Sequence, residues 1–163
     1  MITQEWVQPV DKIHKLYKAA SNVLDKNGHE LITAYPVVRP DGRGSVMLIN
    51  KDENNGHSVR VTFDDPATKQ TRFFTGTVDR IVFGPAEYKW HPDPDSAANA
   101  AQAAGDVEED DDASPSPGRG LGSGHADPDG PASKSAVTAV GADTLYDLPK
   151  ASIVVLRGNL SAQ

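Results

Sequence analysis

Two predicted strands have bulky aliphatic or methionine side chains at four consecutive positions, which sets them apart from strands that alternate apolar and polar residues. These stretches are VMLI at 46–49 and IVVL at 153–156. Successive side chains of a strand point to opposite faces, so strands at these positions have apolar side chains on both faces. In SVRVTF at 58–63 the valines and the phenylalanine alternate with polar residues, which is typical of a strand with one buried face.

Short segments rich in β-branched and aromatic residues, separated by turn signals, fill most of the chain. Asn27-Gly28, Asp41-Gly42 and Asn55-Gly56 are typical of tight turns. The predicted strands are EWV near the start, IHKLYK (13–18), LITAYPVV (31–38), SVMLIN (45–50), SVRVTF (58–63), GTVDRIVFG (76–84), AEYKW (86–90), TLYDL (144–148) and SIVVLRG (152–158). These eight or nine strands predict an all-β fold, an antiparallel β-sandwich of about eight strands.

Two local assignments follow from the same pattern. The Asn55-Gly56 turn predicts a hairpin between the strands at 45–50 and 58–63. Residues 10–24 have apolar positions that fit either a helical face or the alternation of a strand, and we favour the strand.

A long insert interrupts the strand pattern. Residues 92–136 contain no aromatic residue, and Ala, Gly, Pro and Ser occupy 28 of the 45 positions. They have too little apolar surface to offset the entropy lost on ordering. We therefore predict a β-sandwich formed by 1–91 and 137–163, and a disordered low-complexity insert at 92–136.

The negative charge of the chain belongs to this insert. It has ten acidic and two basic residues, a net charge of −8, whereas the remaining residues have 13 acidic and 14 basic ones. The sandwich therefore lacks the cationic surface that binds phosphates, and we predict no nucleic-acid partner. No apolar run is long enough to span a bilayer and no signal peptide is recognisable, so we predict no membrane partner and assign no compartment.

The apolar strands at 46–49 and 153–156 raise the question of what lies against their second faces. One face of each strand packs into the sandwich core. The other face requires a partner domain, an oligomer or a central position beneath a loop, because the chain predicts no helices that would pack against an antiparallel sheet. Two such strands favour a neighbouring domain.

Several strand motifs resemble a known family. LITAYPVVRPDGRGSVMLINKD, SVRVTF, VDRIVFGPAEYKWH and LYDLPKASIVVLRG are similar to the C-terminal β-sandwich of retaining (β/α)8-barrel glycoside hydrolases of the xylosidase and arabinofuranosidase type. The resemblance covers most of 2–91 and 143–160. It implies a sandwich that packs beside a catalytic barrel, in an enzyme that is periplasmic or secreted. The barrel itself requires more residues and alternating helices, so it is absent from this chain.

The chain offers no convincing catalytic or metal-binding set. Retaining hydrolysis needs two carboxylates about 5 Å apart in a sugar-sized cleft. Glu5, in TQEW, precedes an aromatic residue as a barrel glutamate does, but sheet-like sequence follows it at once. His91 and His125 share an H-x-D-P-D context, which also suits a simple turn. We therefore predict no catalytic residues, no metal and no cofactor.

Three aromatic residues are candidates for carbohydrate binding. Tyr88 and Trp90 in EYKWH share one side of a strand, and Trp6 is a third candidate. Sugar rings stack on exposed aromatic faces, although aromatic residues two apart on a strand also commonly fill a core.

The sequence thus predicts a non-catalytic accessory β-sandwich of a bacterial glycoside hydrolase acting on plant-type polysaccharides. Its expected partner is a catalytic glycosidase barrel, or a second copy bound through an apolar sheet face. The alternatives are an autonomous carbohydrate-binding module and a structural sandwich that dimerises without a sugar ligand.

Overall fold

The computed structural model describes residues 2–65, 69–92, 124–128 and 130–161. The chain divides into two compact units, one formed by Met1–Glu87 and Pro131–Gln163 and the other by Tyr88–Gly130. We call them the sheet unit and the ribbon unit and describe each by itself. The regular structure is almost entirely antiparallel strand, which confirms the predicted all-β class.

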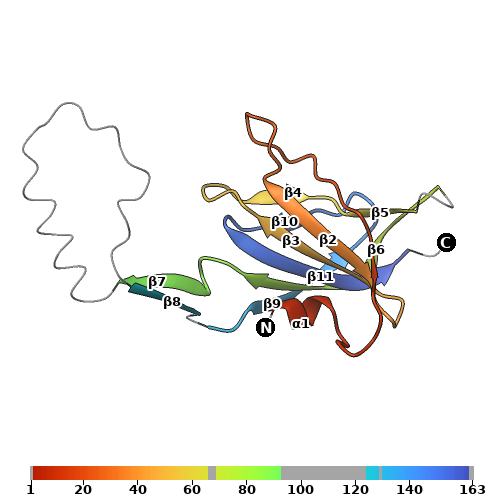
Figure 1. Ribbon diagram of the computed structural model, residues 1–163. Helices are drawn as coiled ribbons and strands as arrows, with labels where there is room; N and C mark the ends of the chain where they lie inside the picture. The colour runs from red at the N-terminus through yellow and green to blue at the C-terminus, as the bar shows by residue number, and fades with distance from the viewer. Residues whose placement is uncertain (1, 66–68, 93–123, 129, 162–163) are drawn as a thin grey trace, which may run out of the picture. The chain divides into compact units, whose positions relative to one another are not determined.

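The sheet unit is built on a seven-stranded antiparallel sheet (Figure 1). The strand order is β1-β2-β3-β11-β6-β5, and β9 also pairs with β6. The strands are β1 Lys15–Leu16, β2 Ile32–Val38, β3 Gly44–Asn50, β5 Thr62–Asp65, β6 Gln70–Phe83, β9 Ser133–Ala139 and β11 Ser152–Leu160. β3 and β11, which contain the two doubly apolar stretches, are neighbours at the centre of this sheet.

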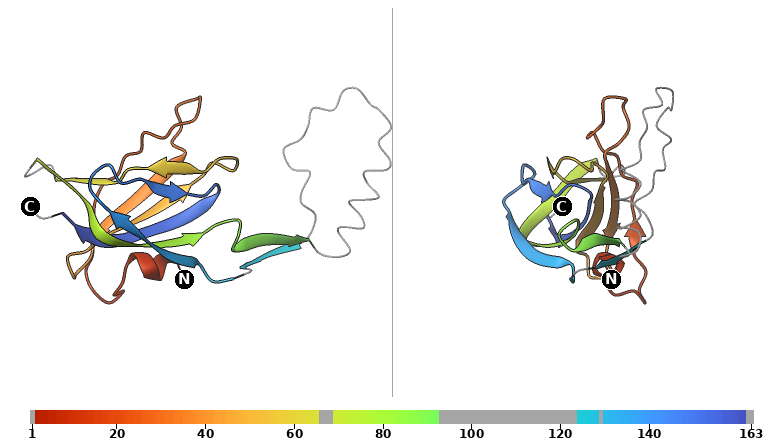
Figure 2. Two further views of the ribbon diagram at one scale, coloured as in Figure 1. Left: turned by 180° about the vertical axis from the view of Figure 1, so that it is seen from behind. Right: turned by 90° about the vertical axis from the view of Figure 1, so that its left-hand side faces the viewer.

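A second layer lies across the sheet. It contains the short pair β4 (His57–Val59) and β10 (Tyr146–Leu148), and β5 continues from β4 after a two-residue break. β6 is long enough to pair with β11 along one part and with β5 along another, so the sheet curls over (Figure 2). The result is a sandwich that resembles a partly open barrel.

The main core lies between these layers. Alternation along the central strands places Val46, Leu48, Val154 and Leu156 on the inner face of the sheet. All four are buried, together with Tyr146 and Leu148 of the opposite layer. Val59, Val61 and Phe63 are partly buried against the same cluster, as their alternation predicted.

The predicted hairpin between residues 45–50 and 58–63 is wrong. β3 pairs with β2 on one side and with β11 on the other, and β4 pairs with β10. The turn near Asn55-Gly56 instead carries the chain from the sheet to the second layer. The buried side chain of Asn50 fixes this crossing, since its Nδ2 donates to the carbonyl oxygens of Asn55 (3.1 Å) and Pro149 (2.8 Å).

The N-terminal segment also differs from its prediction. Glu5 and Trp6 of the predicted EWV strand belong to a short helix, α1 (Ile2–Trp6), and Val7 follows it in a bend. In residues 10–24 the regular structure is the two-residue β1 and a bridge at Leu24. The side chains of Ile13, Leu16 and Tyr17 are exposed, and Val23 alone packs against the main core, so the apolar residues of this segment do not share one buried face.

The predicted insert extends too far toward the C-terminus. Residues 133–136 lie in β9, which pairs with β6, and Ala132 beside them is buried. Small residues suffice here because the ladder hydrogen bonds do not depend on side-chain size. The ribbon unit contains β7 (Tyr88–Pro92) paired with β8 (Gly124–Pro128). The disorder predicted for 93–123 and 129 lies outside the described residues.

Candidate functional site

The outer face of the sheet is partly covered by the chain itself. This face has Met47, Ile49, Ile153 and Val155, the alternate residues of the two doubly apolar strands. α1 contacts β3, β6 and β11, and Trp6 packs with Met47 around the buried Val155. A short helix that the sequence did not predict thus covers part of the second face.

Polar contacts fix α1 on this face. Trp6 Nε1 donates to the carbonyl oxygen of Tyr35 at 2.8 Å, and the two rings meet edge to face. Glu5 forms ion pairs with Lys134 and with Arg157 (3.0 Å). The hydrogen bond from Lys134, assisted by Arg157, lowers the pKa of Glu5 despite the opposing effect of its burial. Glu5 is therefore a structural anion that holds α1 to β9 and β11.

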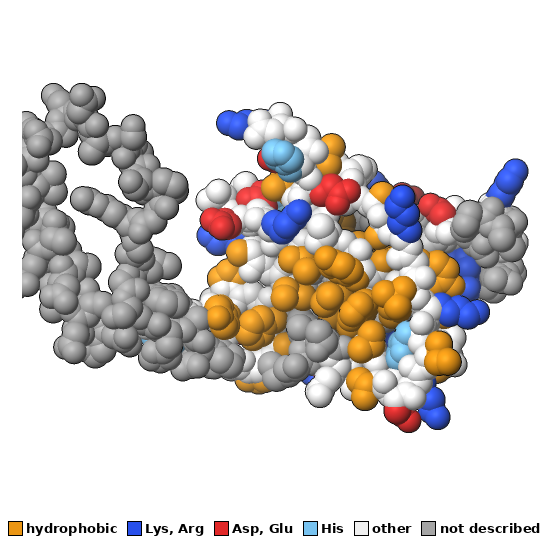
Figure 3. Space-filling view, viewed as in Figure 1, with side chains coloured by type: hydrophobic (Ala, Val, Ile, Leu, Met, Phe, Trp, Pro, Cys, Tyr) orange, Lys and Arg blue, Asp and Glu red, His pale blue; other side chains and the backbone are white. Residues whose placement is uncertain are grey.

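α1 leaves a second row of apolar residues partly accessible. We define the outer strip as the five residues of this row and its margin, all of which are at least partly accessible to solvent: Tyr35, Met47, Ile49, Phe83 and Ile153. Cross-strand pairing makes the strip continuous, since Ile49 lies opposite Ile153 and Ile153 lies opposite Phe83. Hydrophobic side chains gather over β2, β3 and β11 on this side of the molecule (Figure 3).

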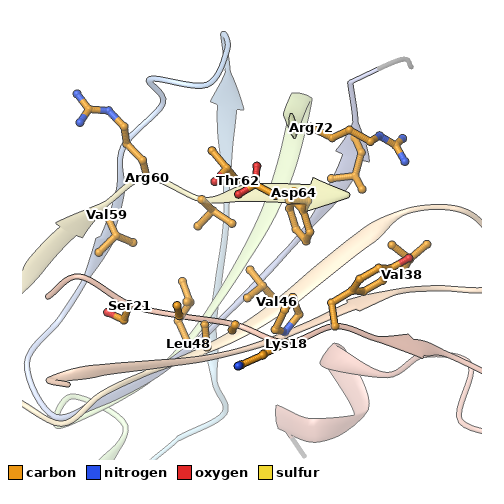
Figure 4. A pocket seen from close by; sticks show the side chains of 18 of the residues that line it. Lys18, Ser21, Val38, Val46, Leu48, Val59, Arg60, Thr62, Asp64 and Arg72 are labelled. Atoms are coloured by element: carbon orange, nitrogen blue, oxygen red, sulfur yellow. The ribbon is translucent and has the colours of Figure 1, made fainter. Parts of the chain in front are cut away.

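A cleft of about 860 Å³ opens on the inner side of the sandwich (Figure 4). Its floor is formed by Ala34, Val46 and Leu48 of β2 and β3, and Val59 and Phe63 of the second layer lie across from them. The segment from Ile13 to Val23 contributes a third wall. The cleft lies between the curled end of the sheet at β5 and the opposite end at β1 and β2, where the barrel-like curl does not close.

The charges around this cleft are unbalanced. Five cationic residues line it, whereas Asp64 is the one carboxylate among its lining residues. The cations are Lys15, Lys18, Arg39, Arg60 and Arg72. Arg60 is ion-paired with Asp143 at 3.2 Å, and buried Arg39 lies 3.9 Å from Asp41. Within the described part of the chain, no carboxylate lies within ion-pair distance of Lys15 or Lys18.

Burial changes the pKa of Arg39, which lies at the end of the cleft. Desolvation lowers the pKa of its guanidinium, while Asp41 acts in the opposite direction. The positive charges of Arg157 and Arg43 lower the same pKa further. Arg43 and Arg157 are themselves ion-paired with Asp79, at 3.4 and 3.1 Å, so the positive charge near Arg39 is partly balanced.

The predicted aromatic residues are distributed over both units. Tyr88 and Trp90 occupy positions on one face of β7, as expected from their spacing, and Tyr88 is exposed. Trp6 belongs to the sheet unit, where it packs against the outer face. A sugar-binding role for these three residues stays a prediction.

The cleft has one carboxylate, that of Asp64, among its described lining residues. The single lining carboxylate, Asp64, cannot supply the pair that retaining glycoside hydrolysis uses in a cleft. Among the described side chains, no group of three His, Cys, Asp or Glu residues could hold a metal ion. No helix in the described ranges has the length and apolar character of a membrane span.

The sequence did not reveal the cleft. Its lining residues come from five separated segments, and they become neighbours only because β4 leaves β3 and crosses to the other layer. Comparison with protein-family models gave no match, and comparison with curated proteins gave none either.

Proposed function

We propose that this chain is a non-catalytic accessory β-sandwich of a glycoside hydrolase acting on plant-type polysaccharides, and that it packs against a catalytic (β/α)8 barrel. The family resemblance of its strand motifs suggests the type of enzyme. The outer strip is the observation that carries the docking role, because it is a continuous apolar surface left beside α1.

The chemistry of the strip suits a permanent interface. Apolar residues from four neighbouring strands, β2, β3, β11 and β6, contribute to it. Interfaces that persist resemble a domain core cut in half and are more hydrophobic than transient ones. Tyr35 and Met47 add an aromatic ring and a flexible thioether, two side chains that are enriched at such interfaces.

The first test is to read the source DNA on both sides of the coding sequence. We expect a barrel with two active-site glutamates, in the same reading frame or in a separate one. Co-expression of that barrel with this chain should then give a stable complex, measured by sedimentation velocity. Ile49→Lys and Ile153→Lys should each weaken the complex, because each places an unpaired charge in an apolar interface.

Thr138→Lys provides the matched control. Thr138 is exposed on β9, so this substitution adds the same charge at a position away from the outer strip. The absence of any neighbouring hydrolase barrel would refute the proposal. So would a complex that the two lysine substitutions leave intact. A homodimer of the isolated chain that dissociates in Ile49→Lys would favour the structural alternative, in which a second copy occupies the strip.

An autonomous carbohydrate-binding role is the second candidate, favoured by the exposed ring of Tyr88. Saturable binding to xylan in affinity electrophoresis, lost in Tyr88→Ala or Trp90→Ala and retained in Tyr17→Ala, would support it. Tyr17 is a suitable control because it is comparably exposed but lies in the sheet unit. Equal binding by all three variants would count against a Tyr88 and Trp90 platform.

A further inference from the structure

We propose that the inner cleft binds one free amphiphilic molecule with an apolar chain and an anionic head group. The site is separate from the outer strip, and the proposal does not depend on the docking function. Its basis is a cleft inside a curled sheet that has apolar side chains on its floor and opposite wall, and more cationic than anionic residues among those that line it.

The size and walls of the cleft fit a small apolar ligand. Its volume of about 860 Å³ falls within the range of about 300–1,000 Å³ that is usual for ligand pockets. Apolar side chains from both layers face it, among them Val46 and Leu48 from the floor and Val59 from the opposite strand (Figure 4). Curled sheets of about eight strands are able to hold one small ligand in this position.

The cations specify the charge of the head group. Lys15 lies directly opposite Val38 across the β1–β2 ladder, so both occupy the face that borders the cleft. Arg72 lies opposite Phe63 in the same way, and its Nε donates to the carbonyl oxygen of Ser161 at 3.0 Å. Lys18 completes the set from the third wall (Figure 4). A carboxylate or sulfate would find complementary charge here, whereas a cationic head group would be repelled.

The backbone beside the cleft favours a small molecule over an added peptide strand. A strand joining β2 needs free backbone groups along the edge of β2. Residues 15 and 16 already pair with Val37 and Val38, and the Tyr17 amide donates to the carbonyl oxygen of Pro36 at 3.1 Å. Near the other end, the Leu31 amide donates to the carbonyl oxygen of Val23. The chain itself therefore occupies both ends of this edge.

The proposal is tested by isothermal titration calorimetry of the full chain with dodecanoate below its micelle concentration. We expect saturable binding of one molecule per chain. Dodecyltrimethylammonium, which has the same tail and the opposite charge, should bind at least about tenfold more weakly. Equal affinity for the two amphiphiles would overturn the assignment of an anionic head group.

Two substitutions place the ligand in the cleft. Ala34→Phe fills the floor and should abolish binding, whereas Thr33→Phe adds the same ring on the opposite face and should not. Lys18→Glu should lower the affinity for dodecanoate at least about fivefold. Lys26→Glu, in an exposed turn outside the cleft, should leave that affinity unchanged. If Ala34→Phe does not fold, the comparison of Lys18→Glu with Lys26→Glu still tests whether the ligand lies in the cleft.

Several results would refute the proposal. These are no saturable binding, several dodecanoate molecules per chain, or unchanged binding by both Ala34→Phe and Lys18→Glu. Flotation of the chain with phosphatidylglycerol vesicles in the absence of dodecanoate binding would indicate a lipid surface instead. Saturable binding of an extended apolar and acidic peptide, without competition by dodecanoate, would indicate an added strand.

Discussion

Individual polar side chains determine how this chain crosses between its two layers. The crossing occurs directly after β3, where the backbone leaves the sheet and begins β4. Asn50 and Asp52 are the two side chains that organise this turn. Asn50 is almost completely buried, whereas Asp52 lies at the turn and receives hydrogen bonds from it. Each supports a separate prediction.

Asn50→Ala should destabilise the fold by roughly 2–3 kcal/mol, because the buried Asn50 amide makes three hydrogen bonds that alanine cannot replace. The side chain donates to Asn55 and Pro149 and its Oδ1 accepts from the Asp52 amide at 3.0 Å. Urea unfolding followed by circular dichroism provides the measurement. Asn54→Ala, in the exposed part of the same turn, should change stability by less than about 0.5 kcal/mol. Equal effects of the two substitutions would contradict this role of Asn50.

The pH dependence of stability should report on Asp52. The backbone amides of Asn54 and Asn55 donate to its carboxylate, and His57 Nε2 lies 2.9 Å from Oδ2. These hydrogen bonds lower the pKa of Asp52 well below its ordinary value of 3.8. A lowered pKa means that the contribution to stability is present above the unfolded-state pKa and is lost as the pH falls toward the folded-state pKa.

We therefore expect the urea midpoint to fall on acidification below about pH 4, and to fall less steeply in Asp52→Asn. Urea titrations at a series of pH values measure both slopes. Glu53→Gln, at the same turn, controls for the change in net charge. If Asp52→Asn and the unmodified chain lose stability in parallel, the hydrogen bonds of Asp52 do not contribute as proposed.

At the scale of elements, the hydrophobic pattern predicted strands well and their partners poorly. The strands at 31–38, 45–50 and 152–158 appear close to their predicted bounds because β-branched residues and flanking turns define them locally. Pairing depends on distant residues. The turn at Asn55-Gly56 indicated a hairpin, but the contact of Asn50 with Pro149, far along the chain, directs β4 to the other layer.

The N-terminal helix illustrates the same limit. α1 has five residues, too few for a recognisable helical period, and it is held by tertiary contacts. The sequence indicated apolar side chains on both faces of the central strands, and it could not indicate that Trp6 covers part of the outer face. The cleft was equally inaccessible to prediction, since it is formed by segments that are far apart in sequence.

Removal of the Trp6 ring should expose the outer face. Trp6→Ala loses the packing on Met47 and the hydrogen bond to Tyr35, and we expect a loss of roughly 2–3 kcal/mol, somewhat below the cost of truncating a fully buried tryptophan. Thermal unfolding measures the loss, and binding of an anilinonaphthalene dye should increase. Gln4→Ala removes an exposed side chain of the same helix and is the control. Unchanged stability in Trp6→Ala would mean that α1 does not stabilise the sheet.

At the scale of the whole molecule, the two units have separate roles in stability. The buried clusters on both faces of the sheet consist of residues of the sheet unit, from the N-terminal part of the chain and from its C-terminal part. These two parts are joined in sequence by residues 88–130, which make up the ribbon unit. Folding of the sheet must therefore close a long loop, which carries an entropic cost that grows slowly with loop length.

Replacing residues 93–123 with a Gly/Ser linker of about eight residues tests this separation. Every residue of the two buried clusters is retained, so the replacement removes no described core contact. The replacement shortens the connection between Glu87 and Pro131 from 43 residues to about 20, and this halving should stabilise the fold by about 0.6 kcal/mol. Differential scanning calorimetry should thus give an equal or slightly higher melting temperature. An insert of the same length and reversed sequence is the control, because it keeps the loop entropy unchanged. A melting temperature that falls by many degrees in both variants would show that the natural segment contributes contacts of its own to the sheet unit.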